Sequence, residues 1–427
     1  FTDILLDLYV QIVYYNNVAK KKERIAMQCM QKNNIPLRQY IAVLGITIAA
    51  FIFNTSEFMP IGLLSDISGA FHMTEAGTGI MITAYAWVVA VLSLPLMLLV
   101  SKIELKRLLL ATITLFCIGQ ILSGAAVNFV MLLIARICVA CAHSVFWSIA
   151  APIAVQLVSK EHRAMALSMV ATGTSVAMIF GLPLGRMIGL YLGWRMTFML
   201  IAVAAFATMV YLFFVFPRLT NQANFSVAEL PNLLKNSVLT SIYVLTALTA
   251  TAYYTGYSYI EPFLSRAAHL SDSWITMLLI VFGFSGFIGS CLFSIFYNHY
   301  RFRFIRFSFA ALTLSLLVLQ AAAANFYAIL GICVLWGIAS MAFNITLQSE
   351  VMQCVPIHAN AVAMSIYSGI FNLGIGTGTW FGGWVTTQYT VANIGYAGGG
   401  IGVMAVLYCL IYVIRKIKRK EQAKTIA

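Results

Sequence analysis

Uncharged stretches of about 20 residues follow one another along most of this chain, separated by short polar segments. A helix needs about 20 mainly apolar residues to cross the hydrocarbon core of a bilayer. The stretches 77–100 and 391–414, for example, contain no charged residue. The pattern predicts twelve spanning helices, at 39–64, 77–100, 108–127, 129–158, 164–192, 196–217, 237–260, 274–297, 304–324, 326–349, 359–387 and 391–414.

The composition agrees with this pattern, since 61% of the residues are hydrophobic and only 9% are charged. Soluble domains carry about 25% charged residues, so we predict an all-α, multi-pass membrane protein. The longest polar interior segment follows the sixth span, which divides the helices six plus six, as in transporters built from two repeats. The predicted parts are an N-terminal segment (1–38), a six-helix bundle (39–217), a central loop (218–236), a second six-helix bundle (237–414) and a basic tail (415–427).

The distribution of the net charge of +13 predicts the orientation. Nearly all lysines and arginines fall in segments that share one side of the membrane, and the exceptions are Arg136, Arg186, Arg195 and Arg266. Because cytoplasmic loops are enriched in these residues, both termini are expected in the cytoplasm. The basic tail is expected to meet anionic lipid headgroups rather than a nucleic acid.

The first residues of the chain differ from a secretory signal, because their charges follow the apolar part instead of preceding it. The run Lys-Lys-Lys-Glu-Arg at 20–24 can be spelled by purine-rich codons that resemble a ribosome-binding site. We therefore expect translation to begin at Met27 or Met30, with residues 1–26 as leader. The alternative is a short interfacial helix.

Three ionisable residues lie deep within predicted spans, where burial of charge is costly and usually marks function. Glu57 and Arg136 each lie about seven residues from the outer end of their spans, so an ion pair between them is expected. His143 continues the face of Arg136 two turns on, followed by Trp147. Glu57 and His143 are candidates for a proton relay, with Arg136 as a structural or coupling partner. The alternative is a hydrogen bond that joins the first and fourth helices.

Two further acids lie near helix ends. Glu261 precedes Pro262 at the outer end of the seventh span, and a role in proton or substrate binding competes with that of a gate residue. Glu350, near the cytoplasmic end of the tenth span, is expected in a salt bridge at a gate.

Amide and aromatic side chains gather on a few of the spans. Aromatic rings stack on the C–H faces of sugars and amides bind hydroxyl groups, so such a set suits a neutral polyol. Hydrogen bonding between helices is the other interpretation. The candidate substrate-binding residues are Asn54, Trp147, Tyr254, Tyr257, Glu261, Asn344, Gln348 and Asn372.

Glycines recur at helical spacing in the fifth span, at Gly181, Gly185 and Gly189 around Pro183. The eleventh span, its counterpart in the second repeat, has a similar group that begins at Gly374. Small residues allow close helix crossing, and proline with glycine allows kinking. These residues are therefore expected in helix packing and gating.

Six segments together resemble the major facilitator superfamily, in its twelve-helix drug:proton antiporter branch, and within it the bacterial sugar efflux transporters of the SotB type. They are AAFIFNTSEFMPIGLLSDI (49–67), AYAWVVAVLSLP (84–95), RICVACAHSVFWSIAA (136–151), GLPLGRMIGLYLGWRMTF (181–198), TGYSYIEPF (255–263) and SGIFNLGIGTG (368–378).

The resemblance implies a transporter of the cell inner membrane that exports arabinose and related sugars, with the proton gradient as its driving force. An antiporter of drugs or other amphiphiles is the alternative. Arg136 matches the family's fourth-helix arginine, the glycines around Pro183 match its fifth-helix motif, and Glu57 and His143 match a buried acid and histidine of the subgroup. We expect a monomer with no cofactor, no metal site and no catalytic residue.

The loop after the second span departs from the pattern of the superfamily. That pattern usually reads Gly-x-x-x-Asp-Arg-x-Gly-Arg-Lys, and here only Lys106 and Arg107 remain. The replacements are Leu98, Lys102, Ile103 and Leu105. The usual cytoplasmic latch is therefore not expected.

Overall fold

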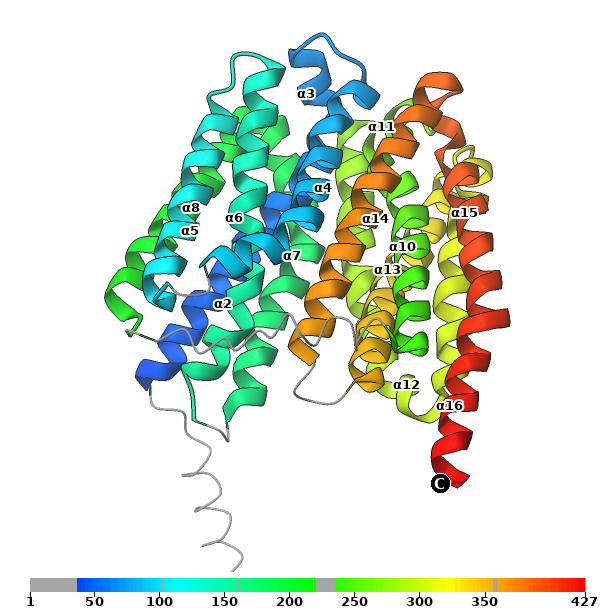
Figure 1. Cartoon of the computed structure of the whole chain (residues 1–427). Coiled ribbons are helices and arrows are strands. Elements are labelled where there is room, and N and C mark those ends of the chain that lie inside the picture. The colour runs from blue at the N-terminus through cyan, green and yellow to red at the C-terminus, as the bar shows by residue number, and fades with distance from the viewer. Residues whose placement is uncertain are drawn as a thin grey trace, which may run out of the picture.

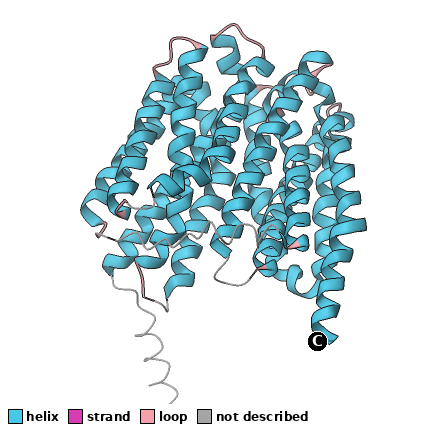
Figure 2. Cartoon of the chain, viewed as in Figure 1, coloured by secondary structure: helices cyan, strands magenta, loops and turns pink. Residues whose placement is uncertain are grey.

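The computed structural model describes residues 37–426, apart from 101–102, 160–161, 218, 220–234 and 356–359. Within these ranges the chain consists of helices joined by short connections, with no strand (Figures 1 and 2). The prediction of an all-α membrane fold is therefore confirmed. Residues 1–26, with the leader hypothesis, and most of the predicted central loop lie outside the described residues.

The first half of the chain starts with a helix that changes its winding on its way across the bundle. Pro60 lies in a 3₁₀ segment, and the path then continues as α-helix to Ala70. The first span is thus longer than the predicted 39–64. The elements of this half are α2 (Leu37–Phe58), η1 (Met59–Leu63), α3 (Leu64–Ala70), α4 (Glu75–Val100), α5 (Leu105–Gly124), α6 (Phe129–Gln156), α7 (Arg163–Leu192) and α8 (Trp194–Val215).

The second half contains one helix that covers both the eighth and ninth predicted spans. Its backbone leaves helical geometry at Tyr300, with φ −129° and ψ 37°, which marks the turn between the two. The elements are α10 (Ser237–Tyr257), α11 (Ile260–Arg266), α12 (Asp272–Ala322), α13 (Phe326–Cys354), α14 (Asn360–Gln388), η5 (Val391–Asn393), α15 (Ile394–Tyr408), the π-helical η6 (Cys409–Val413) and α16 (Ile414–Ile426).

Among the described residues, nine helical segments are long and apolar enough to cross a membrane, and α7 makes a tenth if its two bent parts count as one. The two remaining predicted spans are α10 and α14, whose threonines, tyrosines and glycines make them more polar. The twelve-span topology, the domain bounds and the cytoplasmic termini stay predictions.

Glycines of α7 let it lie directly against the first span. A Cβ built on Gly185 would lie 2.6 Å from Cβ of Met59, and one on Gly189 would lie 2.2 Å from Cδ2 of Leu63. Gly181 lies against Thr55 in the same way. These three residues therefore form the close helix contact expected of them.

Pro183 lies within this glycine series, and α7 bends nearby. Proline cannot donate the hydrogen bond to the carbonyl four residues earlier, here that of Ile179. The helix bends by 40° between the segments Met165–Ala177 and Ile179–Leu192. The bend lies where the missing hydrogen bond would weaken the helix.

The eleventh span repeats this packing in the second half. A Cβ on Gly374 would lie 2.5 Å from Cβ of Ala250, and one on Gly378 would lie 2.5 Å from the carbonyl oxygen of Thr251. Thus α14 packs on α10 as α7 packs on α2. The fifth helix lies on the first and the eleventh on the seventh, which is the correspondence expected of two repeats.

Figure 1 shows the helices α2 to α8 on one side of the molecule and α10 to α16 on the other. The two sets meet along α4 and α14, and along α7 and α12. At the first contact, the Trp87 ring lies against Gly376. At the second, the Ile179 backbone lies against Gly283. The candidate site lies along the second contact.

Candidate functional site

The buried acid and histidine of the first half face each other. Oε2 of Glu57 lies 3.6 Å from Nε2 of His143, and their side chains are 10% and 3% exposed. Glu57 is the penultimate residue of α2, and His143 lies in the middle of α6. The structure therefore brings together the two residues predicted to exchange a proton.

The expected ion pair between Arg136 and Glu57 is wrong, because none forms between them in the described structure. Instead, the Arg136 guanidinium donates to Oγ and the carbonyl oxygen of Ser56, at 3.2 and 3.1 Å. It also lies 4.5 Å from the centre of the Tyr85 ring. The physical reason is the direction of the side chains: successive helical residues lie about 100° apart around the axis, so Ser56 faces Arg136 while Glu57 faces His143. The first span also continues to Ala70, so Glu57 lies deeper than estimated.

Aromatic side chains enclose the acid–histidine pair. The rings of Tyr85 and Trp147 lie 5.6 and 6.1 Å from the His143 ring, between ring centres. Nδ1 of His143 and the Tyr85 hydroxyl are buried without a hydrogen-bond partner within the described residues. Buried polar atoms are usually paired, so these atoms mark a place where a proton or a small polar molecule could be exchanged.

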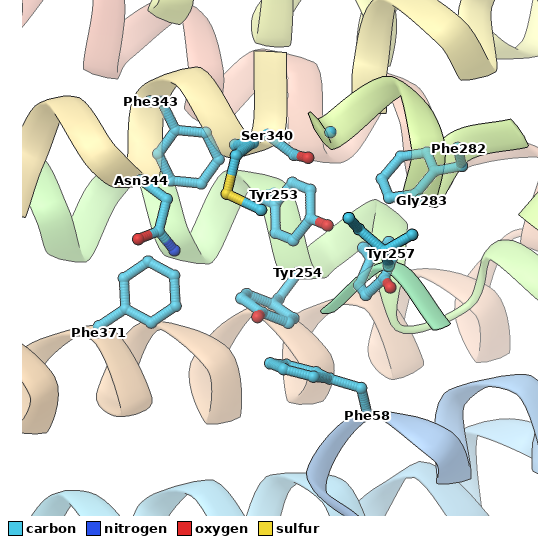
Figure 3. Close-up of a pocket in the computed structure, with 13 residues that line it drawn as sticks. Phe58, Tyr253, Tyr254, Tyr257, Phe282, Gly283, Ser340, Phe343, Asn344 and Phe371 are labelled. Atoms are coloured by element: carbon cyan, nitrogen blue, oxygen red, sulfur yellow. The ribbon is translucent and has the colours of Figure 1, made fainter. Parts of the chain in front are cut away.

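A pocket lies between the two halves, mainly within the second (Figure 3). It encloses about 460 Å³ of space that no protein atom fills, open solvent included. The residues that line it carry no charge. They are Phe58, Ile179, Tyr253, Tyr254, Tyr257, Phe282, Gly283, Gly286, Ser340, Met341, Phe343, Asn344 and Phe371.

Tyrosines of α10 form one wall of this pocket. The rings of Tyr253 and Tyr257, one turn apart, stack with their centres 4.8 Å apart. Tyr254 meets the ring of Phe371 edge to face at 6.0 Å. Figure 3 shows Phe58, from α2, near Tyr254 on the side of the pocket away from Phe343. The pocket is therefore an aromatic box with hydroxyl and amide groups at its edges.

The pocket and the acid–histidine pair adjoin each other. Phe58 follows Glu57 in the chain and lines the pocket. In addition, Tyr254 lies within electrostatic range of the Glu57 carboxylate. A change of charge on Glu57 would therefore be felt at the pocket wall.

Four of the residues predicted to bind substrate lie together. Tyr254, Tyr257 and Asn344 line the pocket, and Gln348, one turn further along α13, donates to Oδ1 of Asn344. Asn372 lies next to the lining residue Phe371, but its amide donates to the carbonyl of Ser368 in its own helix, at 3.0 Å.

The other predicted substrate residues lie elsewhere. Asn54 and Trp147 belong to the first half, where Trp147 contacts the ring of His143. Glu261 lies outside the pocket, in a buried cluster with Arg186, whose Nη1 is 2.9 Å from its carboxylate. Their roles stay predictions.

The acid expected at the cytoplasmic end of the second half is ion-paired within that half. Oε2 of Glu350 lies 2.6 Å from Nη2 of Arg301, and Tyr297 donates to the same carboxylate. Both partners come from α12, so this salt bridge does not join the two halves. Lys106, the second residue of α5, donates to the carbonyl oxygens of Phe213 and Phe216 and so caps the end of α8.

Sequence reasoning missed several lining residues, chiefly Phe58, Phe282, Ser340, Phe343 and Phe371. Except for Phe371 of α14, they lie in apolar helices that contain many other aromatic residues. Only the rotation of each helix about its axis decides which ring reaches the pocket. The polarity of α10 and α14 was the available signal, since polar residues in a span usually face the protein interior.

The fold and the pocket define a membrane transporter. Residues 46–367 match the Major Facilitator Superfamily, and the chain belongs to this family. It is therefore a multi-pass membrane transporter of small molecules and not an enzyme.

Solved structures of other transporters share this fold. A bacterial homolog of the human lysosomal transporter Spinster, inward-facing and unoccupied, is 16% identical, with 88% of this chain and 95% of that chain covered and a TM-score of 0.69. A mutant of the nucleoside transporter NupG is 15% identical, with 87% and 100% covered and a TM-score of 0.72. Such low identities establish the common fold alone.

Proposed function

We propose that the protein exports small neutral sugars across the bacterial inner membrane in exchange for protons. The observation that carries the proposal is a pocket without charged lining residues that adjoins a buried acid–histidine pair. In this reading the protein is a monomer, the proton gradient supplies the driving force, and no cofactor is needed.

The pocket wall supports a neutral substrate with both apolar and hydroxyl-bearing faces. Stacked tyrosine rings offer flat surfaces to C–H groups. The hydroxyl groups of Tyr253, Tyr254 and Tyr257 and the amide of Asn344 offer hydrogen bonds. A charged substrate would lack a counter-charge among the lining residues.

The acid–histidine pair supports proton coupling. Ionisable groups inside a membrane protein are costly, and they commonly form proton relays. Histidine changes its charge near physiological pH in water, and a carboxylate within 3.6 Å is a natural partner for its proton. Arg136 holds the backbone of Ser56 and so positions Glu57, the next residue.

Transport of amphiphilic drugs is a second candidate, and the phenylalanines of the pocket favour it. Phe58, Phe282, Phe343 and Phe371 give most of the wall an apolar surface. An amphiphile would bind there mainly through burial of apolar area. The amide pair of Asn344 and Gln348 would then add little to its affinity.

Purified protein in vesicles of defined orientation tests the proposal. Exchange of one proton for one neutral sugar moves one net charge, worth about 2.3 kcal/mol at about 100 mV. A tenfold concentration ratio costs about 1.4 kcal/mol, so the voltage alone could sustain a ratio of roughly 50. We expect voltage-driven sugar export at equal pH on both sides. Voltage-independent transport would rule out one-for-one exchange, and transport restricted to amphiphiles would favour the second candidate.

A further inference from the structure

A buried cluster of charges joins the two halves at the end of the molecule where η1 and α3 follow α2. Nη1 of Arg186, from α7, lies 2.9 Å from Oε1 of Glu261, from α11. The same nitrogen donates to the carbonyl oxygen of Gly62 at 3.1 Å. Nη2 of Arg186 lies 2.6 Å from Oδ1 of Asp272 at the start of α12. One arginine of the first half thus holds two acids of the second.

Glu261 also binds the first half through its other oxygen. Oε2 accepts hydrogen bonds from the hydroxyl of Ser65 at 2.7 Å and from its backbone N–H at 3.3 Å. The side chains of Arg186 and Glu261 are only 2% and 3% exposed, whereas that of Asp272 is 66% exposed. The ion pair between Arg186 and Glu261 is therefore buried, whereas Asp272 is solvated and its ion pair with Arg186 contributes little to stability.

The described ion pairs between the halves all lie at this end. Besides the two ion pairs of Arg186, a third joins Arg266 of α11 to Glu75 of α4. The remaining described ion pairs are internal to one half, as between Arg301 and Glu350. In the predicted orientation this end faces the outside, so opening of the pocket to that side requires these contacts to break.

We propose that Arg186 and Glu261 form the outer gate, and that a proton on Glu261 opens it. A protonated carboxyl group loses its ion pair with Arg186, and the exposed Asp272 is a weak substitute. This inference deepens the proposed function, because it gives the proton an action at the gate in addition to the pocket.

The surroundings of Glu261 hold few other charges. The elements packed against it contribute Asp66 from α3, Arg186 from α7 and Asp272 from α12, while η1 and η5 contribute no titratable residue. Its own helix carries Arg266, which is paired with Glu75. Glu75 is also a buried carboxylate that pairs across the halves, but its partner Arg266 is 59% exposed, whereas Glu261 pairs with the buried Arg186. The other acids of the cluster add repulsion to Glu261.

Distance measurements between spin labels test the gate without substrate or gradient. Val127 and Tyr327 are each 80% exposed and lie at this end of the two halves, next to α6 and in the first turn of α13. Labels on Val127→Cys and Tyr327→Cys, in a chain whose eight native cysteines are replaced, should show the shorter distance near pH 8. They should move apart at about pH 5, where a carboxylate can take up a proton.

Glu261→Gln should favour the longer distance at both pH values, by about tenfold or more in population, because removal of one partner of a buried ion pair is strongly destabilising. Glu350→Gln is the matched control, since that buried acid is paired within one half. It should keep the short distance near pH 8 and the response to acid. Unchanged distances in Glu261→Gln, or no response of the parent protein to acid, would overturn the proposal.

The acid response of the parent protein needs no substitution at the gate, so misfolding of a variant cannot hide the result. The label distance is also independent of transport. A protein that exports no sugar but opens on acidification would contradict the proposed function and leave the gate intact. Proton-driven sugar export with an acid-insensitive gate would support the proposed function and contradict the proposed gate.

Discussion

The two halves of this transporter share a helix crossing but hold different chemistry. In both, a glycine-lined helix packs directly on the first helix of its repeat, as Gly185 does on Met59 and Gly378 on Thr251. The first half then holds Arg136 and His143 in its interior, with the Glu57 side chain only 10% exposed beside them. The second half presents an uncharged aromatic pocket at the same level. The packing is thus common to the repeats, and the site residues are not.

This difference suggests a division of tasks. Next to the pocket, the buried ionisable groups belong to the first half, where Arg136 and His143 lie near the Glu57 carboxylate, whereas the buried acids of the second half, Glu261 and Glu350, lie outside the pocket lining. The pocket remains free of fixed charge and can accept a neutral molecule. Phe58, which follows Glu57 in the chain and lines the pocket, and Tyr254, within electrostatic range of the Glu57 carboxylate, connect the two regions.

The largest expected effect comes from Glu57→Gln, which keeps the shape of the side chain and removes its charge. The sugar ratio sustained by the voltage should fall from roughly 50 to about 1, because no proton is then carried against the sugar. Downhill exchange of sugar should remain. Accumulation in vesicles at fixed voltage measures both.

The same assay on Glu350→Gln is the control for loss of a buried acid. That residue is paired with Arg301, far along the chain from the proposed coupling site. Its substitution should leave the accumulation ratio near the parent value. Full accumulation by Glu57→Gln would mean that the first half does not carry the proton.

A smaller effect is expected from Gly185→Val and Gly378→Val, which test whether the crossings are equivalent. A Cβ at these positions would lie 2.6 Å from Met59 and 2.5 Å from the Thr251 backbone. Overpacking of this kind costs about 1–3 kcal/mol. Thermal unfolding should show a lower midpoint for both variants, more so for Gly378→Val, because a backbone atom cannot move aside.

Gly400→Val provides the control for these substitutions, because nothing lies within 4 Å of a Cβ at that helical position. Its unfolding midpoint should stay close to that of the parent. If valine lowered the unfolding midpoint at only one of the two crossings, the repeats would share the arrangement of their helices but not the tightness of this packing.

The smallest effect concerns Asn344→Leu in the pocket. A hydrogen bond to a neutral group contributes about 1 kcal/mol, which corresponds to about fivefold in affinity. The half-saturating sugar concentration should rise by about that factor. For an amphiphilic substrate it should stay constant or fall. Equal weakening for both substrate types would remove the distinction between a sugar site and a drug site.

The sequence predicted most of the helices, because spans of this length have few alternatives in a bilayer. It did not predict that the first span continues through Pro60 to Ala70. The run Leu-Leu-Ser-Asp-Ile at 63–67 reads equally well as the end of a span or the start of a loop. This error in length placed Glu57 too close to the end of its span.

The site itself was only partly predictable, for a related reason. Successive helical residues lie about 100° apart around the axis, so depth alone does not separate Ser56, which binds Arg136, from Glu57, which faces His143. The residues of the proposed gate were even less predictable from the sequence. Arg186, Glu261 and Ser65 come from three elements far apart in the chain, and only the assembled halves bring them together.

The most direct test of the division of tasks is the number of protons released when sugar binds to the purified protein in weakly buffered solution. A pH-sensitive dye, with the membrane gradient absent, follows this release. Sugar should displace protons from the parent protein and none from Glu57→Gln, with sugar binding retained by both. Equal proton release by the two proteins would contradict this division of tasks.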